Sequence, residues 1–186
     1  MDKTKVKYKK IAFAVISILA IFVLCFYSIP IRKEIDTTVI GIQFRIGDQP
    51  SDYIEREITL KGTYKRYLFG NKQSTYQGFF SIEGYDYTFG IEIVCELISN
   101  WPNISEAGSI GFLQYWDMNS HHNVNFLGSV LCTKNFNEFI ISIYEPVGDH
   151  SQGWNRDSGL IICAPAINRE DAGKIIELLV KESAFL

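Results

Sequence analysis

Hydrophobic and polar residues alternate with a period of two over much of the chain. Between residues 40 and 46, isoleucine or phenylalanine stands at every second position, and residues 58–65 and 85–93 alternate similarly. A period of two is typical of a strand with one buried face and one face in water. We therefore expect a strand at each of these places, with a tight hairpin at Glu83-Gly84 before the third.

Four further apolar runs follow, and no helical pattern lies between them. They cover residues 109–116, 123–132, 138–144 and 160–164. Successive short strands that are joined only by turns predict an antiparallel sheet. We expect this sheet to form a sandwich or a partial barrel.

The last part of the chain changes to the period of a helix. Asn168 is a good N-cap, and Glu170 and Asp171 follow in the first turn, where the helix dipole favours acidic side chains. A stripe of four apolar residues comes next: Ile175, Ile176, Leu179 and Val180. The sequence thus predicts an α+β domain, mainly antiparallel β, with one C-terminal helix packed on the sheet.

A run of nineteen residues from Ile11 to Ile29 contains no charged side chain. A helix of this length, at about 1.5 Å per residue, covers the hydrocarbon core of a bilayer, which is roughly 30 Å thick. The alternative is a cleavable signal peptide, but its apolar region is shorter and a small-x-small cleavage motif follows it. We find no such motif here and expect residues 11–30 to be an uncleaved, single-pass transmembrane signal anchor.

Lysines set the expected orientation of this anchor. Five lysines precede the run, whereas only Arg32 and Lys33 follow it closely. The positive-inside rule then predicts a protein of the cell membrane with residues 1–10 as a cytoplasmic basic tail. Residues 31–38 would form a short stalk, and residues 39–186 an extracytoplasmic β-rich domain.

The part of the chain beyond residue 30 is acidic, with 13 basic and 20 acidic residues. No lysine or arginine occurs between Lys72 and Lys134. Nucleic-acid binding depends mostly on neutralising phosphates, so this composition argues against a nucleic-acid partner. The lipid bilayer, contacted from Ile11 to Ile29, is the one partner that the sequence itself indicates.

Three cysteines lie beyond the predicted anchor, each between apolar neighbours: Cys95, Cys132 and Cys163. None has the spacing of a zinc or redox motif, and we expect them to behave as small buried hydrophobic residues. A Cys132–Cys163 disulfide remains open if their strands are neighbours. The polar segment with Asp117, His121 and His122 is a weak metal motif, because adjacent extended residues point in opposite directions. We expect neither a metal nor a cofactor.

The loop Glu145–Gly159 is the one long irregular connection, and long loops in compact domains are often binding loops. Its candidate ligand-binding residues are Asp149, His150, Trp154, Arg156 and Asp157. An exposed tryptophan beside arginine and carboxylates suits the recognition of a polar ligand, a glycan or a protein. In the alternative interpretation, Trp154 packs back onto the end of the sheet.

The chain has none of the common catalytic motifs: no nucleophile elbow, zinc-protease helix, P-loop or dinucleotide-binding loop. We therefore favour a membrane-anchored, non-enzymatic binding or accessory domain with an envelope protein or glycan as its partner. One alternative is a hydrolase-like envelope enzyme whose site lies near the Glu145–Gly159 loop, where Ser151, His150 and Asp157 offer a triad on paper. The other is a carrier that holds a small apolar ligand inside a β-barrel.

Overall fold

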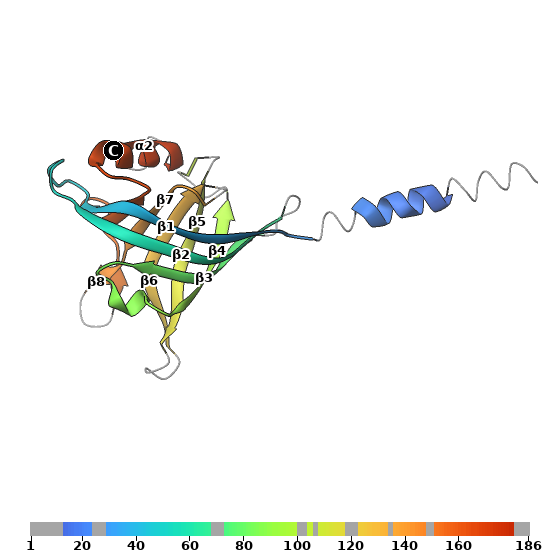
Figure 1. Cartoon of the computed structure of the whole chain (residues 1–186), viewed down its shortest axis with the longest axis horizontal. Helices are drawn as coiled ribbons and strands as arrows, with labels where there is room; N and C mark the ends of the chain where they lie inside the picture. Colours follow the sequence, from blue (N-terminus) through green and yellow to red (C-terminus); the bar gives the residue numbers. More distant parts are fainter. Residues whose placement is uncertain are drawn as a thin grey trace, which may run out of the picture.

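The fold is a closed barrel of eight antiparallel strands with one helix against its outer wall (Figure 1). The computed structural model describes residues 13–23, 29–67, 73–99, 104–105, 108–117, 123–133, 136–147 and 151–180. Of the two predicted β architectures the protein has the barrel, and this barrel is closed rather than partial. The C-terminal helix and the mainly antiparallel β structure are confirmed.

Seven of the barrel strands follow one another around the wall, and the last one closes the barrel against the first. In order around the barrel they are β1 (Ile31–Arg45), β2 (Ile54–Arg66), β3 (Ser74–Ile82), β4 (Glu92–Ser99), β5 (Gly108–Asp117), β6 (Asn123–Thr133), β7 (Phe139–Ile143) and β10 (Leu160–Ala164). Between β7 and β10, the short strands β8 (Glu145–Pro146) and β9 (Gln152–Gly153) form a separate small hairpin.

Strand β1 is much longer than the alternation of the sequence predicted. It pairs with β2 from Ile31 to Gln43, but with β10 only from Ile42 to Arg45. Residues 31–38, which we expected to be a stalk, are thus the first half of a barrel strand. Their side chains alternate less clearly than those of residues 40–46, because only Ile35 of this half is buried.

The predicted strand over residues 85–93 is wrong except at its last two residues. Its first half forms a turn and the short 3-10 helix η1 (Asp86–Thr88), and β4 begins only at Glu92. Thr88 explains the turn, since its hydroxyl donates to the Tyr85 carbonyl and accepts from the Ile82 amide. Alternation of tyrosines alone could not reveal these local hydrogen bonds, which compete with a ladder.

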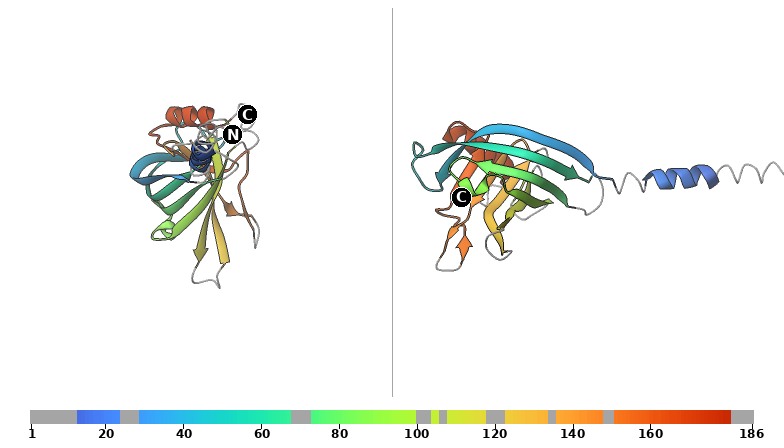
Figure 2. Two further views of the ribbon diagram at one scale, coloured as in Figure 1. Left: turned by 90° about the vertical axis from the view of Figure 1, so that its right-hand side faces the viewer. Right: turned by 60° about the horizontal axis from the view of Figure 1, so that its bottom comes forward.

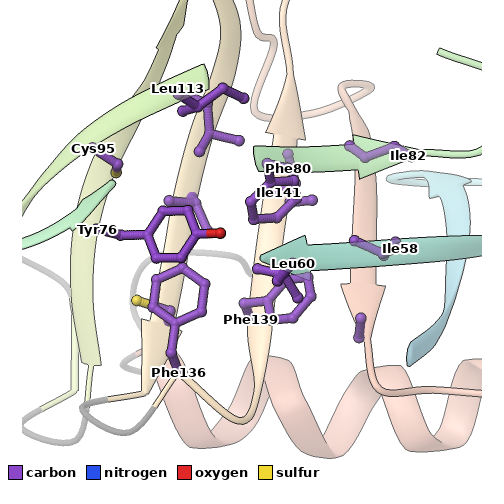
Figure 3. Packing of buried hydrophobic residues seen from close by; sticks show 14 of the residues in the cluster. Ile58, Leu60, Tyr76, Phe80, Ile82, Cys95, Leu113, Phe136, Phe139 and Ile141 are labelled. Carbon is purple, nitrogen blue, oxygen red and sulfur yellow. The ribbon is translucent and has the colours of Figure 1, made fainter. Parts of the chain in front are cut away.

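Large apolar side chains fill the interior of the barrel (Figure 3). Tyr76 and Phe136 stack with their ring centroids 5.2 Å apart, while Phe80 meets Phe139 edge to face. An eight-stranded barrel is just wide enough for its side chains to fill it or to hold one small ligand. Here the interior carries a packed aromatic and aliphatic core.

The helix α2 (Arg169–Leu179) covers the outer side of the wall formed by β1, β7 and β10 (Figure 2). As predicted, Asn168 is its N-cap, and its side chain accepts a hydrogen bond of 2.9 Å from the Asp171 amide. Buried Ala172, Ile175 and Leu179 pack on outward residues of those strands. The barrel therefore has two cores, one inside and one beneath α2.

The predicted membrane anchor is only partly within the described residues. Residues 13–23 are helical, whereas residues 1–12 and 24–28 lie outside the described ranges. Within those ranges, no helix has both the length and the apolar character needed to cross a bilayer.

Candidate binding site

Several connections meet at the end of the barrel opposite Ile31, where β1 begins, and we call this the distal end (Figures 1 and 2). They are the turn after β1, the segment around η1, and the loop between β7 and β10 that contains the β8–β9 hairpin. Polar and aromatic side chains from all three gather around the last inward-facing residues of β1. The distal end is therefore the best candidate for a functional site.

Gln43 is the centre of this cluster. It is only 9% exposed, which is unusual for a glutamine, and its side-chain oxygen accepts two hydrogen bonds. Arg56 Nε donates one at 2.9 Å and the Tyr85 hydroxyl donates the other at 3.1 Å. A buried polar group is costly unless it is paired, so these bonds hold all three side chains in place.

Gly84 makes room for Arg56. A β-carbon at this position would lie 2.4 Å from Arg56 Nη1, and the backbone φ of +79° also favours glycine. The guanidinium carbon lies 5.8 Å from the centre of the Tyr85 ring, within the range of a cation–π interaction. Among the described residues, no acidic side chain forms an ion pair with Arg56.

Three tyrosines extend the cluster across the barrel end. Tyr85 meets Tyr87 edge to face at 5.9 Å, and Tyr87 lies 6.2 Å from Tyr115 of β5. Burial raises the pKa of Tyr87 to about 12 and also raises the pKa of Tyr85. Their hydroxyls are therefore neutral at physiological pH and suited to hydrogen bonding rather than to acting as bases.

Arg45 joins the cluster to the predicted binding loop. Its guanidinium forms a two-pronged ion pair with Glu145, in which Nη1 lies 2.8 Å from Oε2. Nη1 also donates to the Ser158 carbonyl at 3.0 Å. The hydrogen bonds from Arg45 lower the pKa of Glu145, which therefore stays ionised at neutral pH. Both ends of the loop are thus attached to β1.

An open hollow of about 540 Å³ adjoins the cluster. Gln43 and Arg45 form part of its wall, and Asp48, Asp52 and Tyr53 from the turn after β1 form another part. The hollow therefore presents a positively charged hydrogen-bond donor, Arg45, and two carboxylate residues, Asp48 and Asp52, beside the aromatic ring of Tyr53. It could accommodate a polar ligand or a side chain of a partner protein.

Trp154 of the predicted site packs against the protein. It is half-buried beside the core beneath α2, and its indole nitrogen donates to the Leu160 carbonyl at 3.1 Å. A β-carbon on Gly159 would lie 2.3 Å from this nitrogen, so the ring lies directly over the glycine. This geometry agrees with the alternative interpretation in which Trp154 covers the end of the sheet.

The remaining predicted residues are less closely associated with the cluster. Arg156 and Asp157 are exposed, and the Asp157 amide donates to the Asn155 side chain at 2.8 Å in a local turn. Asp149 and His150 lie outside the described residues. The Ser151 hydroxyl donates to the Val147 carbonyl, and this contact stabilises the small hairpin.

The arrangement provides side chains that are suited to binding a partner. Arginine and tyrosine are the residue types that most often provide binding energy at interfaces. Within the described ranges, no group of three or more histidine, cysteine or acidic residues is placed to hold a metal ion. Sequence reasoning did not find Gln43, Arg56 or Tyr85, although Gly84 directly before Tyr85 marks a turn.

The three cysteines of the barrel are free and buried, as expected, and no disulfide joins Cys132 to Cys163. Cys132 belongs to the interior core, whereas Cys163 faces α2 on the other side of the sheet. Burial raises the pKa of Cys95 and of Cys163 to about 12. These thiols are therefore protonated and unreactive in the folded protein.

Comparisons with protein families, with curated proteins and with solved structures find no match to this chain. The assignment of a function therefore rests on the residues and geometry described above.

Proposed function

We propose that this protein is a membrane-anchored, extracytoplasmic binding or accessory domain that acts without catalysis. The observation that carries the proposal is the cluster of Arg56, Tyr85, Tyr87 and Tyr115 at the distal end, in which buried Gln43 accepts hydrogen bonds from Arg56 and Tyr85. Fixed aromatic rings beside an arginine are typical of a recognition surface. An envelope protein or a glycan is the proposed partner.

The proposed anchor, from Ile11 to Ile29, suits this position of the site. Strand β1 begins two residues after the anchor and runs to the distal end. If the lysine-rich tail stays in the cytoplasm, the barrel lies outside the membrane and its distal end faces away from the lipid. The site would then be accessible to components of the cell envelope.

The membrane topology has a direct test. A reporter that is active only outside the cytoplasm should work when it is fused after Leu186. Replacing the five tail lysines with neutral residues should weaken this orientation, because the charge bias is its main determinant. Activity from a cytoplasmic reporter alone at the same position would overturn the proposed topology.

The binding function is tested with the full chain in neutral-lipid nanodiscs. Binding to isolated cell wall and to solubilised envelope proteins is measured for the native chain, Arg56→Ala and Tyr87→Ala. Each variant should bind at least about tenfold more weakly, as is usual for residues at the centre of an interface. Lys174→Ala on the outer side of α2 is the control and should bind normally. Equal binding by all four proteins would refute the proposed site.

A second candidate function is the carriage of a small apolar ligand. A cavity of about 300 Å³ opens near the start of β1, and Ile35, Val39, Leu60, Phe136 and Phe139 form its apolar part. Because the deeper interior is packed, a ligand would have to fit within this end cavity. A fluorescent fatty-acid analogue should bind the native chain and not Ile35→Trp, which fills the cavity. Equal binding by both would exclude this cavity as the carrier site.

A further inference from the structure

The outer face of the barrel over β3 and β4 carries exposed apolar side chains. Phe79 is 43% exposed, Val94 46% and Phe89 55%. The strand register places Val94 beside Gln77, two residues from Phe79, so Phe79 and Val94 are diagonal neighbours. α2 packs on β1, β7 and β10 instead, so this face is not beneath the helix. Exposed apolar groups that gather in this way often mark an interaction surface.

The charges on this face are mostly negative. Glu92 and Glu96 point outward from β4, on either side of Val94. The sequence has no lysine or arginine between Lys72 and Lys134, so β3 to β6 contribute no basic side chain. The exception is Lys61, which points outward from β2 directly opposite Phe79, and its Nζ lies 3.6 Å from a carboxylate oxygen of Asp36 on β1.

A small hollow lies at the edge of the same face. Its volume is about 200 Å³, and its lining residues are Glu57, Thr59, Ser81, Glu83 and Phe89. One oxygen of Glu83 accepts from the Glu57 amide at 3.2 Å, which fixes this carboxylate in place. Two carboxylates, two hydroxyls and an aromatic ring are complementary to an ammonium or guanidinium group.

We propose that this face docks a basic, apolar segment of a partner protein. A lysine or arginine of the segment enters the hollow between Glu57 and Glu83, and its apolar side chains pack on Phe79, Phe89 and Val94. We call these five residues, together with Glu92, the acidic-apolar face.

The signs of the charges favour this occupant over others. A second copy of the chain, docked through the same face about a two-fold axis, would bring glutamates against glutamates. Anionic lipid and nucleic acid would be repelled in the same way. A basic segment is instead attracted by the glutamates at the rim of the face, and its apolar side chains are buried against the apolar residues at the centre.

This docking surface is separate from the distal-end cluster and goes beyond the proposed function. Glu57, Phe79 and Val94 point outward from the barrel wall, whereas Gln43 and Arg56 belong to the cluster at its end. Glu57 and Glu83 are next in sequence to Arg56 and Gly84, so Val94→Ser, whose side chain points outward from β4, is the variant that separates the two surfaces. The two proposals can fail independently.

The test uses the full chain in neutral-lipid nanodiscs and two short amphipathic peptides as probes. One peptide combines leucine with arginine, and the other has glutamate in place of every arginine. Binding is measured for the native chain, for the double variant Glu57→Gln, Glu83→Gln, and for Val94→Ser. The matched control is Glu55→Gln, Glu177→Gln, which removes the same charge from exposed positions on β2 and α2.

The arginine peptide should bind the native chain and the glutamate peptide should not. The Glu57/Glu83 variant and Val94→Ser should each weaken binding about tenfold, a loss expected for central contacts. The control should change binding less than about twofold, since exposed distant charges contribute little. An equal loss in the control, or no binding of the arginine peptide, would overturn the proposal. Tyr87→Ala, an uncharged change at the distal end, should have no effect in the same assay, which keeps this result apart from that of the distal end.

Discussion

Replacing Trp154 with alanine separates the two interpretations of the loop between β7 and β10. The structure places the indole ring over Gly159 and half-buries it beside the core beneath α2. The ring nitrogen also donates a hydrogen bond of 3.1 Å to the Leu160 carbonyl, at the start of β10. Trp154→Ala should therefore destabilise the fold as well as alter the loop.

The expected loss of stability follows from these contacts. Truncating a fully buried aromatic residue to alanine costs about 3–5 kcal/mol, so a half-buried ring should cost about 2 kcal/mol. The lost hydrogen bond adds about 1 kcal/mol, which gives a total of about 3 kcal/mol. For a chain of this size, such a loss lowers the melting temperature by about 6–12 °C. Trp154→Phe keeps most of the packing and should cost only about 1–2 kcal/mol.

The assay is urea unfolding of the native chain, Trp154→Ala, Trp154→Phe and Arg156→Ala, followed by circular dichroism. Arg156 is exposed, and its substitution should change the free energy of unfolding by less than about 0.5 kcal/mol. A loss below about 1 kcal/mol for Trp154→Ala would show that the ring does not support the barrel. If binding were lost at the same time, Trp154 would be a binding residue, as the sequence first suggested.

Four shorter predictions concern the barrel and its titrating groups. A chain that begins at Ile31 should fold cooperatively. A chain that begins at Thr37 should be less stable in urea unfolding, because it lacks buried Ile35 and the β1–β2 pairs before Thr37. Asn168→Ala should lower the free energy of unfolding by about 1 kcal/mol, since α2 loses its N-cap, and the same experiment measures this. The three buried thiols of the barrel should resist alkylation at pH 8 until urea unfolds the chain, because burial raises their pKa, to about 12 for Cys95. Mass spectrometry would detect any modification of Cys95, Cys132 or Cys163 before unfolding. Hydrogen bonding to Arg45 lowers the pKa of Glu145 in the folded protein. The ionised Glu145 should therefore add less than about 1 kcal/mol to the free energy of unfolding above pH 4.5, because the pair is exposed, and this stabilisation should vanish as the pH falls through the lowered pKa. Glu145→Gln should remove this part of the pH dependence in urea unfolding.

Part of the fold could be predicted because its signals are local. The runs that become β7, β10 and α2 lie close to their predicted positions, and the cap at Asn168 forms as expected. Closure of the sheet into a barrel could not be predicted, since it depends on β1 pairing with a strand more than a hundred residues later in the sequence. The first half of β1 was also missed, because only one of its side chains is buried.

The candidate site was hardest to predict because its residues are far apart in the sequence. Gln43 meets Tyr85 across 42 positions, and Arg45 meets Glu145 across 100. These contacts exist only once the strand register is fixed, and no spacing rule reveals them. The loop between β7 and β10 could be singled out by its length, and it does border the cluster through Glu145.

The long pairing of β1 with β2 has a mechanical consequence. If the chain is anchored before Ile31 and a partner holds the distal end, any pull between them acts along β1 rather than across it. The hydrogen bonds from Ile31 to Gln43 would then be loaded together in shear, instead of opening one after another as in a zipper. An antiparallel ribbon loaded in this way resists tension far better than one peeled from its end. In such an arrangement, β1 would also be the element best placed to carry force between the anchor and the bound partner.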